Sequence, residues 1–263
     1  MEENKMEERY SYNCPRGLMD GYSIIHLDSI CTWGKCFLGY GGCFDRRPRF
    51  GECQLWDITK IIQAVKEILA RKSDARIYLE TPDFFDPLKM TGEERYQFRE
   101  LLDEFYVEPL KVFFCVQTTP RNLIYLLEEE KGVLSLSFIR KVGIQEIWLG
   151  VESASPELRG KYSKPPFKNI DLIKATKQLQ EVGIQCCWYL VASPDDTEKT
   201  IRQTVALVNE VKPDRIFTFD LFHYKEGERY VDLPTLQKEI HLMVYYQQVL
   251  KTLSEKIDKE GWK

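Results

Sequence analysis

The sequence contains no apolar run that approaches the roughly 20 residues needed to cross a bilayer. Its first ten residues, MEENKMEERY, are rich in charge and include no apolar core, so they do not resemble a secretory leader. The chain also lacks the G-x-G-x-x-G, P-loop and G-x-S-x-G patterns, which argues against nucleotide-phosphate and acyl-transfer functions. These absences favour a cytoplasmic protein that has no membrane partner and whose chemistry is neither nucleotide-phosphate nor acyl transfer.

The chain also lacks an excess of positive charge. The 263 residues carry a formal net charge of −4, which argues against a protein held to nucleic acid by bulk electrostatics. A hydrophobic content of 43% and a charged content of 30% are typical of a globular chain, and the length suffices for one large core.

Histidine is scarce and cysteine is not. The chain has 3 histidines and 8 cysteines, and four of the cysteines lie between residues 31 and 53. In a cytosolic protein they are expected to be thiols or metal ligands rather than disulfides. Cys115, Cys186 and Cys187 lie within apolar runs, which predicts that they belong to the core.

Short apolar runs alternate with amphipathic segments from about residue 22 onward. The apolar runs predict strands at 22–30, 76–80, 111–116, 144–153, 186–193 and 215–221. Helical periodicity predicts helices at 58–69, 93–106, 170–182, 195–211 and 235–259, with Asp57 as the N-cap of the first.

An internal echo supports this alternation. Val142-Gly143-Ile144-Gln145 is followed forty residues later by Val182-Gly183-Ile184-Gln185, and each precedes an apolar run. Glycine suits the left-handed position that ends a helix, so each copy predicts a helix that stops where a strand starts.

Strands that alternate with helices and read as apolar runs predict an α/β fold with a parallel sheet covered by helices. Six units are too few for a closed eight-stranded barrel, so we predict a partial (β/α)6 TIM-like barrel, with a doubly wound open sheet as the alternative. Either fold places its chemistry at the carboxyl ends of the strands. We divide the chain into an N-terminal extension (1–21), the barrel (22–230) and a C-terminal helical segment (231–263).

A glycine-rich loop follows the first predicted strand and contains Cys31, Cys36 and Cys43. Thiolates suit iron–sulfur clusters or zinc, and three ligands would leave one iron of a [4Fe–4S] cluster open. Two other interpretations remain: a zinc module that adds Cys53, and buried small side chains with no metal. Density and glycine content favour the metal.

Two later segments carry a family resemblance. The run IWLGVESASPELRGKYSK and the loop VASPDDTEKTIRQTV, in this order after the cysteine loop, resemble the radical S-adenosylmethionine (SAM) superfamily, in particular its cobalamin-associated and methylthiotransferase-like branches. The resemblance covers about residues 22 to 230. The cysteine spacing departs from the common C-x3-C-x2-C pattern, being C-x4-C-x6-C, so Cys53 or Cys14 could replace one ligand.

The resemblance implies an enzyme that reductively cleaves SAM to a 5′-deoxyadenosyl radical and uses it to modify an unknown substrate. It implies a [4Fe–4S] cluster on Cys31, Cys36 and Cys43. Strand-end polar residues are then expected to hold SAM, and these are Glu80, Gln117, Glu152 and Ser153. No catalytic residue beyond these is assigned.

Partners follow from the same resemblance. They are a reductant such as flavodoxin or ferredoxin, a substrate that is either a small molecule or a macromolecule, and a cobalamin subunit on a separate chain. Arg159, Lys161 and Lys164 are candidates for the cofactor carboxylate, although a basic run is usually a solvated face. A barrel that has no cluster and serves as a scaffold is the competing function.

Overall fold

The computed structural model describes residues 21–27, 57–89, 92–107, 112–130, 134–192, 195–220 and 233–260. Its strands are β1 (Tyr22–His26), β2 (Arg76–Glu80), β3 (Phe113–Thr118), β4 (Ile144–Glu152), β5 (Gln185–Ala192) and β6 (Arg215–Asp220). Its helices are α2 (Ile58–Arg71), the 3-10 helix η1 (Asp86–Lys89), α3 (Glu93–Val107), α4 (Pro120–Glu129), α5 (Leu136–Lys141), α6 (Pro156–Lys161), α7 (Asn169–Glu181), α8 (Glu198–Val211) and α9 (Leu233–Glu260).

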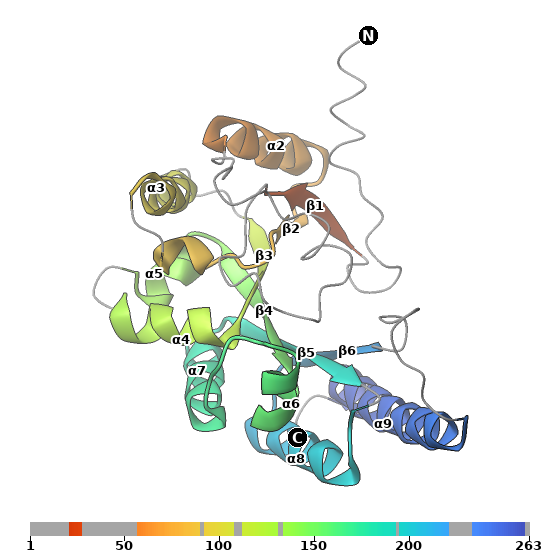
Figure 1. Cartoon of the computed structure of the whole chain (residues 1–263). Helices are drawn as coiled ribbons and strands as arrows, with labels where there is room; N and C mark the ends of the chain where they lie inside the picture. Colours follow the sequence, from red (N-terminus) through yellow and green to blue (C-terminus); the bar gives the residue numbers. More distant parts are fainter. Residues whose placement is uncertain are drawn as a thin grey trace.

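The six strands form one parallel sheet in the order β1-β2-β3-β4-β5-β6. Figure 1 shows helices α3, α4, α5 and α7 along one side of this twisted sheet, and α9 beside β6. Because β1 and β6 lie at opposite edges and are not paired with each other, the barrel is open. The predicted partial (β/α)6 barrel is therefore confirmed.

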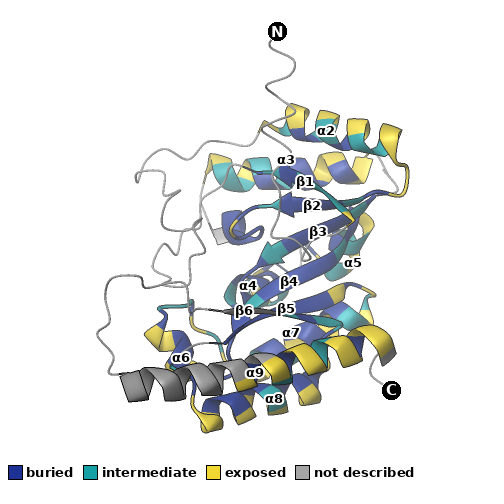
Figure 2. Ribbon diagram, turned by 90° about the vertical axis from the view of Figure 1, so that its right-hand side faces the viewer, coloured by how far each residue is buried: buried dark blue, intermediate teal, exposed yellow. Residues whose placement is uncertain are grey.

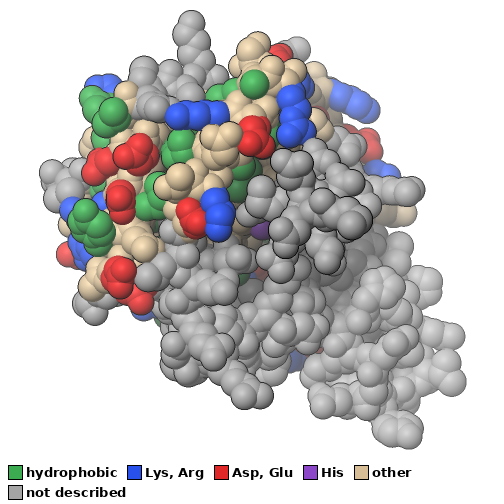
Figure 3. All heavy atoms as spheres, turned by 90° about the horizontal axis from the view of Figure 1, so that it is seen from above, with side chains coloured by type: hydrophobic (Ala, Val, Ile, Leu, Met, Phe, Trp, Pro, Cys, Tyr) green, Lys and Arg blue, Asp and Glu red, His purple; other side chains and the backbone are tan. Residues whose placement is uncertain are grey.

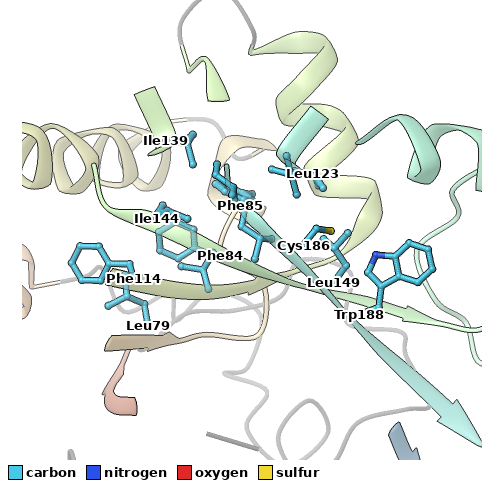
Figure 4. Close-up of a cluster of buried hydrophobic side chains, with 14 of the residues drawn as sticks. Leu79, Phe84, Phe85, Phe114, Leu123, Ile139, Ile144, Leu149, Cys186 and Trp188 are labelled. Atoms are coloured by element: carbon cyan, nitrogen blue, oxygen red, sulfur yellow. The ribbon is translucent and has the colours of Figure 1, made fainter. Parts of the chain in front are cut away.

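The main core lies between the sheet and these helices. Alternate strand residues such as Leu79, Phe114 and Leu149 are fully buried and point to this side. Figure 4 shows them beside Phe84 and Phe85, which follow β2. In Figure 2 the strands are mostly buried, and exposed residues gather on the outer sides of α2, α8 and α9.

The opposite face of the sheet is the inside of the open barrel. Residues that alternate with the main core form a second buried cluster there, consisting of Tyr78, Cys115, Trp148, Cys187 and Tyr189. Trp148 stacks on Tyr189 with ring centroids 4.8 Å apart. Side chains therefore fill the middle of the barrel, as expected of a packed barrel core.

Local sequence signals explain where the helices begin. Asp57 caps α2 by accepting a hydrogen bond from the Lys60 N–H at 3.1 Å, as predicted. Thr119 caps α4, with Pro120 in its first turn. Helix α4 was not predicted from the sequence. The expected strand at 111–116 also ends too early, since β3 runs two residues further, to Thr118.

Helix α9 packs along the edge strand β6. Its Tyr246, Leu250 and Ile257 are buried, and the Ser254 hydroxyl donates to the carbonyl oxygen of Ile216 at 2.9 Å. This contact covers the outer edge of the sheet. The three-part division at residues 21 and 230 stays a prediction.

The surface of the α2–α3 end mixes charges of both signs. Figure 3 shows Lys and Arg side chains interspersed with Asp and Glu, and hydrophobic groups between them. Within the described ranges, no helix combines the length and apolar character needed to cross a bilayer.

The two glycines of the sequence echo both end a helix with positive φ, as predicted. Gly143 has φ +97° and Gly183 has φ +76°. Their surroundings differ: a β-carbon added at Gly143 would lie 2.8 Å from Val112 Cγ1, whereas at Gly183 it would come no closer than 3.9 Å to Arg140 Nε.

This difference predicts unequal stability effects. Gly183→Ala should lower the free energy of unfolding by about 1 kcal/mol, the cost of a left-handed alanine. Gly143→Ala should cost about 3 kcal/mol, because the overpacking of Val112 is added. Urea denaturation of both variants, followed by circular dichroism, measures the two values. Equal losses would contradict the close packing at Gly143.

Candidate functional site

Polar side chains gather at the carboxyl edge of the open barrel. His26, Glu80 and Gln117 end or nearly end β1, β2 and β3, and each lies in the alternation that points inside the barrel. Glu152 ends β4 at the same edge of the sheet. Parallel strands bring their carboxyl ends together, so residues more than 120 positions apart in sequence lie at one edge of the barrel. We call this edge, with His26, Glu80, Gln117 and Glu152, the mouth.

Glu80 is paired with a histidine. The two residues lie directly opposite each other in the β1–β2 register, and His26 Nδ1 contacts Glu80 Oε2. The side chain of His26 is 17% exposed and that of Glu80 is 40% exposed. The sequence predicted Glu80 as a site residue but assigned His26 no role, because the register that joins the two residues is a tertiary feature.

Gln117 lies within β3, not after it as the sequence indicated. Its side-chain Nε2 donates to the carbonyl oxygen of Thr81 at 2.6 Å. The main-chain carbonyl oxygen of Gln117 accepts from the Phe84 N–H at 2.8 Å. Both bonds join the turn after β2 to β3. The amide is thus held at the mouth, beside the turn that follows Glu80.

Glu152 has an unusual backbone and a buried partner. It is a non-glycine residue with φ 63°, next to a register shift between Gly150 and Glu152, and it is only 8% exposed. Its Oε1 accepts from Lys164 Nζ at 2.7 Å, and the side chains of both residues are about one-tenth exposed. A strained conformation at a strand end is a typical mark of a functional site.

Ser153 lies next to Glu152 but its hydroxyl is engaged elsewhere. The Oγ accepts from the Ser155 N–H at 3.1 Å and lies 3.4 Å from Thr204 Oγ1 on α8. Thr204 Oγ1 also accepts from the Ala154 N–H at 3.0 Å. These bonds attach the turn after β4 to α8, so the structure does not bring this hydroxyl together with Glu80 and Gln117.

The basic run after β4 divides into three different environments. Arg159 is buried and donates to the carbonyls of Ser153 and Phe167, and burial lowers its pKa to about 10. Lys161 pairs with Asp195 on the loop before α8. Of the three, Lys164 is the residue that pairs with the Glu152 carboxylate, whereas Arg159 reaches a predicted site residue only at the main-chain carbonyl of Ser153.

Gly150 makes room for the Glu152 carboxylate. A β-carbon added there would lie 3.0 Å from Glu152 Oε1 and 3.6 Å from Lys164 Nζ. The pair therefore folds back over the bare backbone of β4, on the face that carries Trp148 inside the barrel.

The family resemblance implies SAM at this edge. On that expectation, Gly150→Ala should displace the Glu152 carboxylate and weaken SAM binding about fivefold, with a cost of no more than about 1 kcal/mol in unfolding free energy. Gly160→Ala in α6 is the matched control, since a β-carbon there meets nothing within 4 Å. Equilibrium dialysis with labelled SAM and urea denaturation measure the two quantities. If SAM affinity is unchanged in Gly150→Ala, the Glu152 carboxylate does not depend on this space.

A buried carboxyl network behind Gln117 was missed by sequence analysis. Asp83 accepts from the Thr119 N–H at 3.2 Å and Asn122 Nδ2 at 2.9 Å, and also from the Thr118 hydroxyl. Burial, followed by the negative charge of Asp86, raises the pKa of Asp83 to about 6. The network attaches the segment after β2 to the start of α4, and so fixes the wall behind Gln117.

The amino-terminal end of the barrel interior is closed by a second carboxylate. Glu146 on β4 is fully buried and accepts from Arg76 at 2.6 Å, the Tyr22 hydroxyl at 2.7 Å and the indole N–H of Trp148. Arg215 approaches to 3.9 Å from the other side. Burial, then the charge of Glu146, raises the pKa of Tyr22. The mouth at the carboxyl edge therefore has a closed floor.

The three proposed cluster ligands lie outside the described residues, as do Cys14 and Cys53. The cysteines within the described ranges, Cys115, Cys186 and Cys187, are buried thiols, which confirms that they belong to the core. Burial raises the pKa of Cys186 to about 12 and that of Cys115 well above its usual value. In those ranges no three metal-binding side chains converge.

No protein-family model matches this sequence. No curated protein matches it in sequence either. Solved structures with a similar fold include two cobalamin-binding enzymes. The radical SAM methyltransferase TsrM from Kitasatospora setae, with cobalamin and a [4Fe–4S] cluster bound, has a TM-score of 0.58 and 14% identity, over 76% of this chain and 36% of that one.

The cobalamin-dependent SAM radical enzyme OxsB, with aqua-cobalamin and SAM bound, has a TM-score of 0.55 and 13% identity, over 88% of this chain and 31% of that one. The present chain thus spans about a third of the length of these structures. The resemblance indicated by the sequence is confirmed at the level of the fold: this chain has the partial barrel found in radical SAM enzymes.

Proposed function

We propose that this chain is a radical SAM enzyme that binds a [4Fe–4S] cluster and SAM at the carboxyl edge of its barrel. The observation that carries the proposal is the set of Glu80, Gln117, Glu152 and Lys164 at that mouth, in a fold shared with TsrM and OxsB. Fold alone does not fix function, so the proposal depends on the chemistry of this set of side chains.

The side chains at the mouth match the polar groups of SAM. SAM presents an ammonium, a carboxylate and two ribose hydroxyls, and Glu80 offers an acceptor suited to the ammonium. Glu152 can accept hydrogen bonds from ribose hydroxyls, and Lys164 can bind the carboxylate. Glu152 and Lys164 are mostly buried, and their pairing offsets part of the free energy lost when each charge is removed from water.

Cys31, Cys36 and Cys43 follow β1 in the sequence, and β1 ends at this same edge of the sheet. Leu27 follows β1, its N–H donates to the carbonyl oxygen of Glu80 at 2.8 Å, and Cys31 comes four residues later. Four extended residues reach at most ~14 Å, which supports a cluster within reach of the mouth. When bound, the cluster and SAM would together supply a 5′-deoxyadenosyl radical.

The protein's own residues would bind and orient SAM and exclude water from the site. Glu80, Glu152 and Lys164 would orient SAM. Gln117 and the Asp83 network would hold the wall of the site. Glu146 and its hydrogen-bond donors, which we call the plug, close the opposite end of the barrel interior. A closed floor protects reactive species at the mouth from solvent at the opposite end of the barrel.

We include three partners in the proposal: a reductant such as flavodoxin or ferredoxin, cobalamin on another polypeptide or segment, and a substrate that would be methylated or otherwise modified. The cobalamin named for TsrM and OxsB supports the second of these. A cytoplasmic location is part of the same proposal, because a reduced cluster requires a reducing compartment.

The test is anaerobic purification and iron–sulfur reconstitution, with iron and sulfide counted and SAM cleavage assayed under dithionite. The proposal predicts about four irons per chain and the formation of 5′-deoxyadenosine. A colourless protein with one tetrahedral zinc would instead identify a zinc module. A metal-free protein that binds SAM without cleaving it would identify a scaffold.

A further inference from the structure

The His26–Glu80 pair stands at the first two strand ends of the mouth. Because the two residues face each other in the β1–β2 register, the contact between His26 Nδ1 and Glu80 Oε2 is set by the sheet itself. The Leu27 N–H, which donates to the Glu80 carbonyl at 2.8 Å, extends the pairing beyond the strand. The histidine therefore approaches from a rigid backbone.

Glu80 needs such a restraint. Its side chain is 40% exposed, and a glutamate has three rotatable bonds that an exposed carboxylate would otherwise sample. His26 is only 17% exposed and lies on β1 directly opposite Glu80, so its ring is the less mobile partner. Ordering a side chain before a ligand arrives removes part of the entropy that binding would otherwise lose.

The contact also determines which carboxylate oxygen remains for a ligand. His26 holds Oε2, and among the described residues no donor reaches Oε1. A carboxylate accepts through both oxygens, so one can stay with the histidine while the other accepts from an incoming cation. The exposed part of Glu80 lies on the inner, mouth-facing side of β2.

We propose that His26 is a positioning residue that orients the Glu80 carboxylate for the ammonium group of SAM. This inference rests on the proposed function and adds to it a role for a residue that sequence motifs do not mark. We therefore expect His26 to contribute to SAM affinity only through Glu80.

A double-mutant cycle tests this statement. Wild type, His26→Ala, Glu80→Gln and the double variant are reconstituted anaerobically, and the dissociation constant of labelled SAM is measured by equilibrium dialysis. We expect His26→Ala to weaken binding about fivefold and Glu80→Gln about tenfold. In the Glu80→Gln background, the His26 substitution should change affinity less than twofold.

A conservative variant provides the rescue. The side-chain nitrogen of asparagine can occupy the position of His26 Nδ1, so His26→Asn should bind SAM within about twofold of wild type. If His26→Ala does not fold, His26→Leu fills a similar volume without a donor and replaces it in the cycle. Circular dichroism and iron content establish that each variant is intact.

Equal effects of the His26 substitution in both Glu80 backgrounds would overturn the inference, as would an unchanged affinity in His26→Ala. Loss of SAM binding in His26→Asn as large as that in His26→Ala would do the same. These outcomes leave the proposed function standing. A reconstituted wild type that does not bind SAM overturns both, and so the two failures are distinguishable.

Discussion

Glu152→Gln is expected to weaken SAM binding by roughly thirtyfold while the fold stays intact. The substitution keeps the shape of the side chain and removes its charge. Glu152 is held in a left-handed backbone conformation and paired with Lys164 at 2.7 Å, so its carboxylate cannot be replaced by a neighbour or by bulk water. Charge-assisted hydrogen bonds to ribose or ammonium groups are among the strongest that a protein offers.

The matched control is Glu198→Gln. Glu198 is also a carboxylate paired with a basic residue, Arg202, but that pair is exposed on the surface of α8. We expect no change in SAM affinity for this variant. Equilibrium dialysis of both reconstituted variants gives the comparison. Equal SAM affinities in Glu152→Gln and wild type would remove Glu152 from the site.

Glu146→Gln is expected to lower the free energy of unfolding by about 3 kcal/mol. Glu146 is fully buried and is surrounded by donors from four residues, namely Tyr22, Arg76, Cys115 and Trp148. An amide cannot accept from all of them, and it leaves the Arg76 guanidinium, which stacks on Tyr22 and Phe113, without its counter-charge.

Glu67→Gln serves as the control for this prediction. The Glu67 carboxylate meets Arg71 at 4.0 Å on the exposed side of α2, and its loss should change stability by less than about 0.5 kcal/mol. Urea denaturation at pH 7, followed by circular dichroism, resolves this difference. A Glu146→Gln variant as stable as Glu67→Gln would show that the plug contributes little to the fold.

The strands and long helices could be predicted from the sequence because their signals are local. The limits of β2 were predicted without error, and Asp57 was recognised as a cap. Helix α4 was missed although Thr119 and Pro120 form a standard start signal, and the end of the preceding strand was placed two residues too early.

The site was only partly predictable because its contacts cross between strands. The strand-end position of Glu152 could be predicted from the sequence, but its partner could not be chosen from the basic run, because the contacts that distinguish Lys164 from Arg159 form only after folding. His26 and Glu146 gave no local signal. A polar residue inside a barrel strand has the same alternation as one on a solvated face.

The central claim is most directly tested by the iron content and 5′-deoxyadenosine yield of cysteine variants. Cys31→Ala, Cys36→Ala and Cys43→Ala are compared, after anaerobic reconstitution, with the buried core variant Cys186→Ala. We expect about four irons per chain and 5′-deoxyadenosine formation in wild type and Cys186→Ala. We expect iron binding and product formation to be lost in each of the three loop variants. Iron content and product formation that survive in all three loop variants would contradict the central claim.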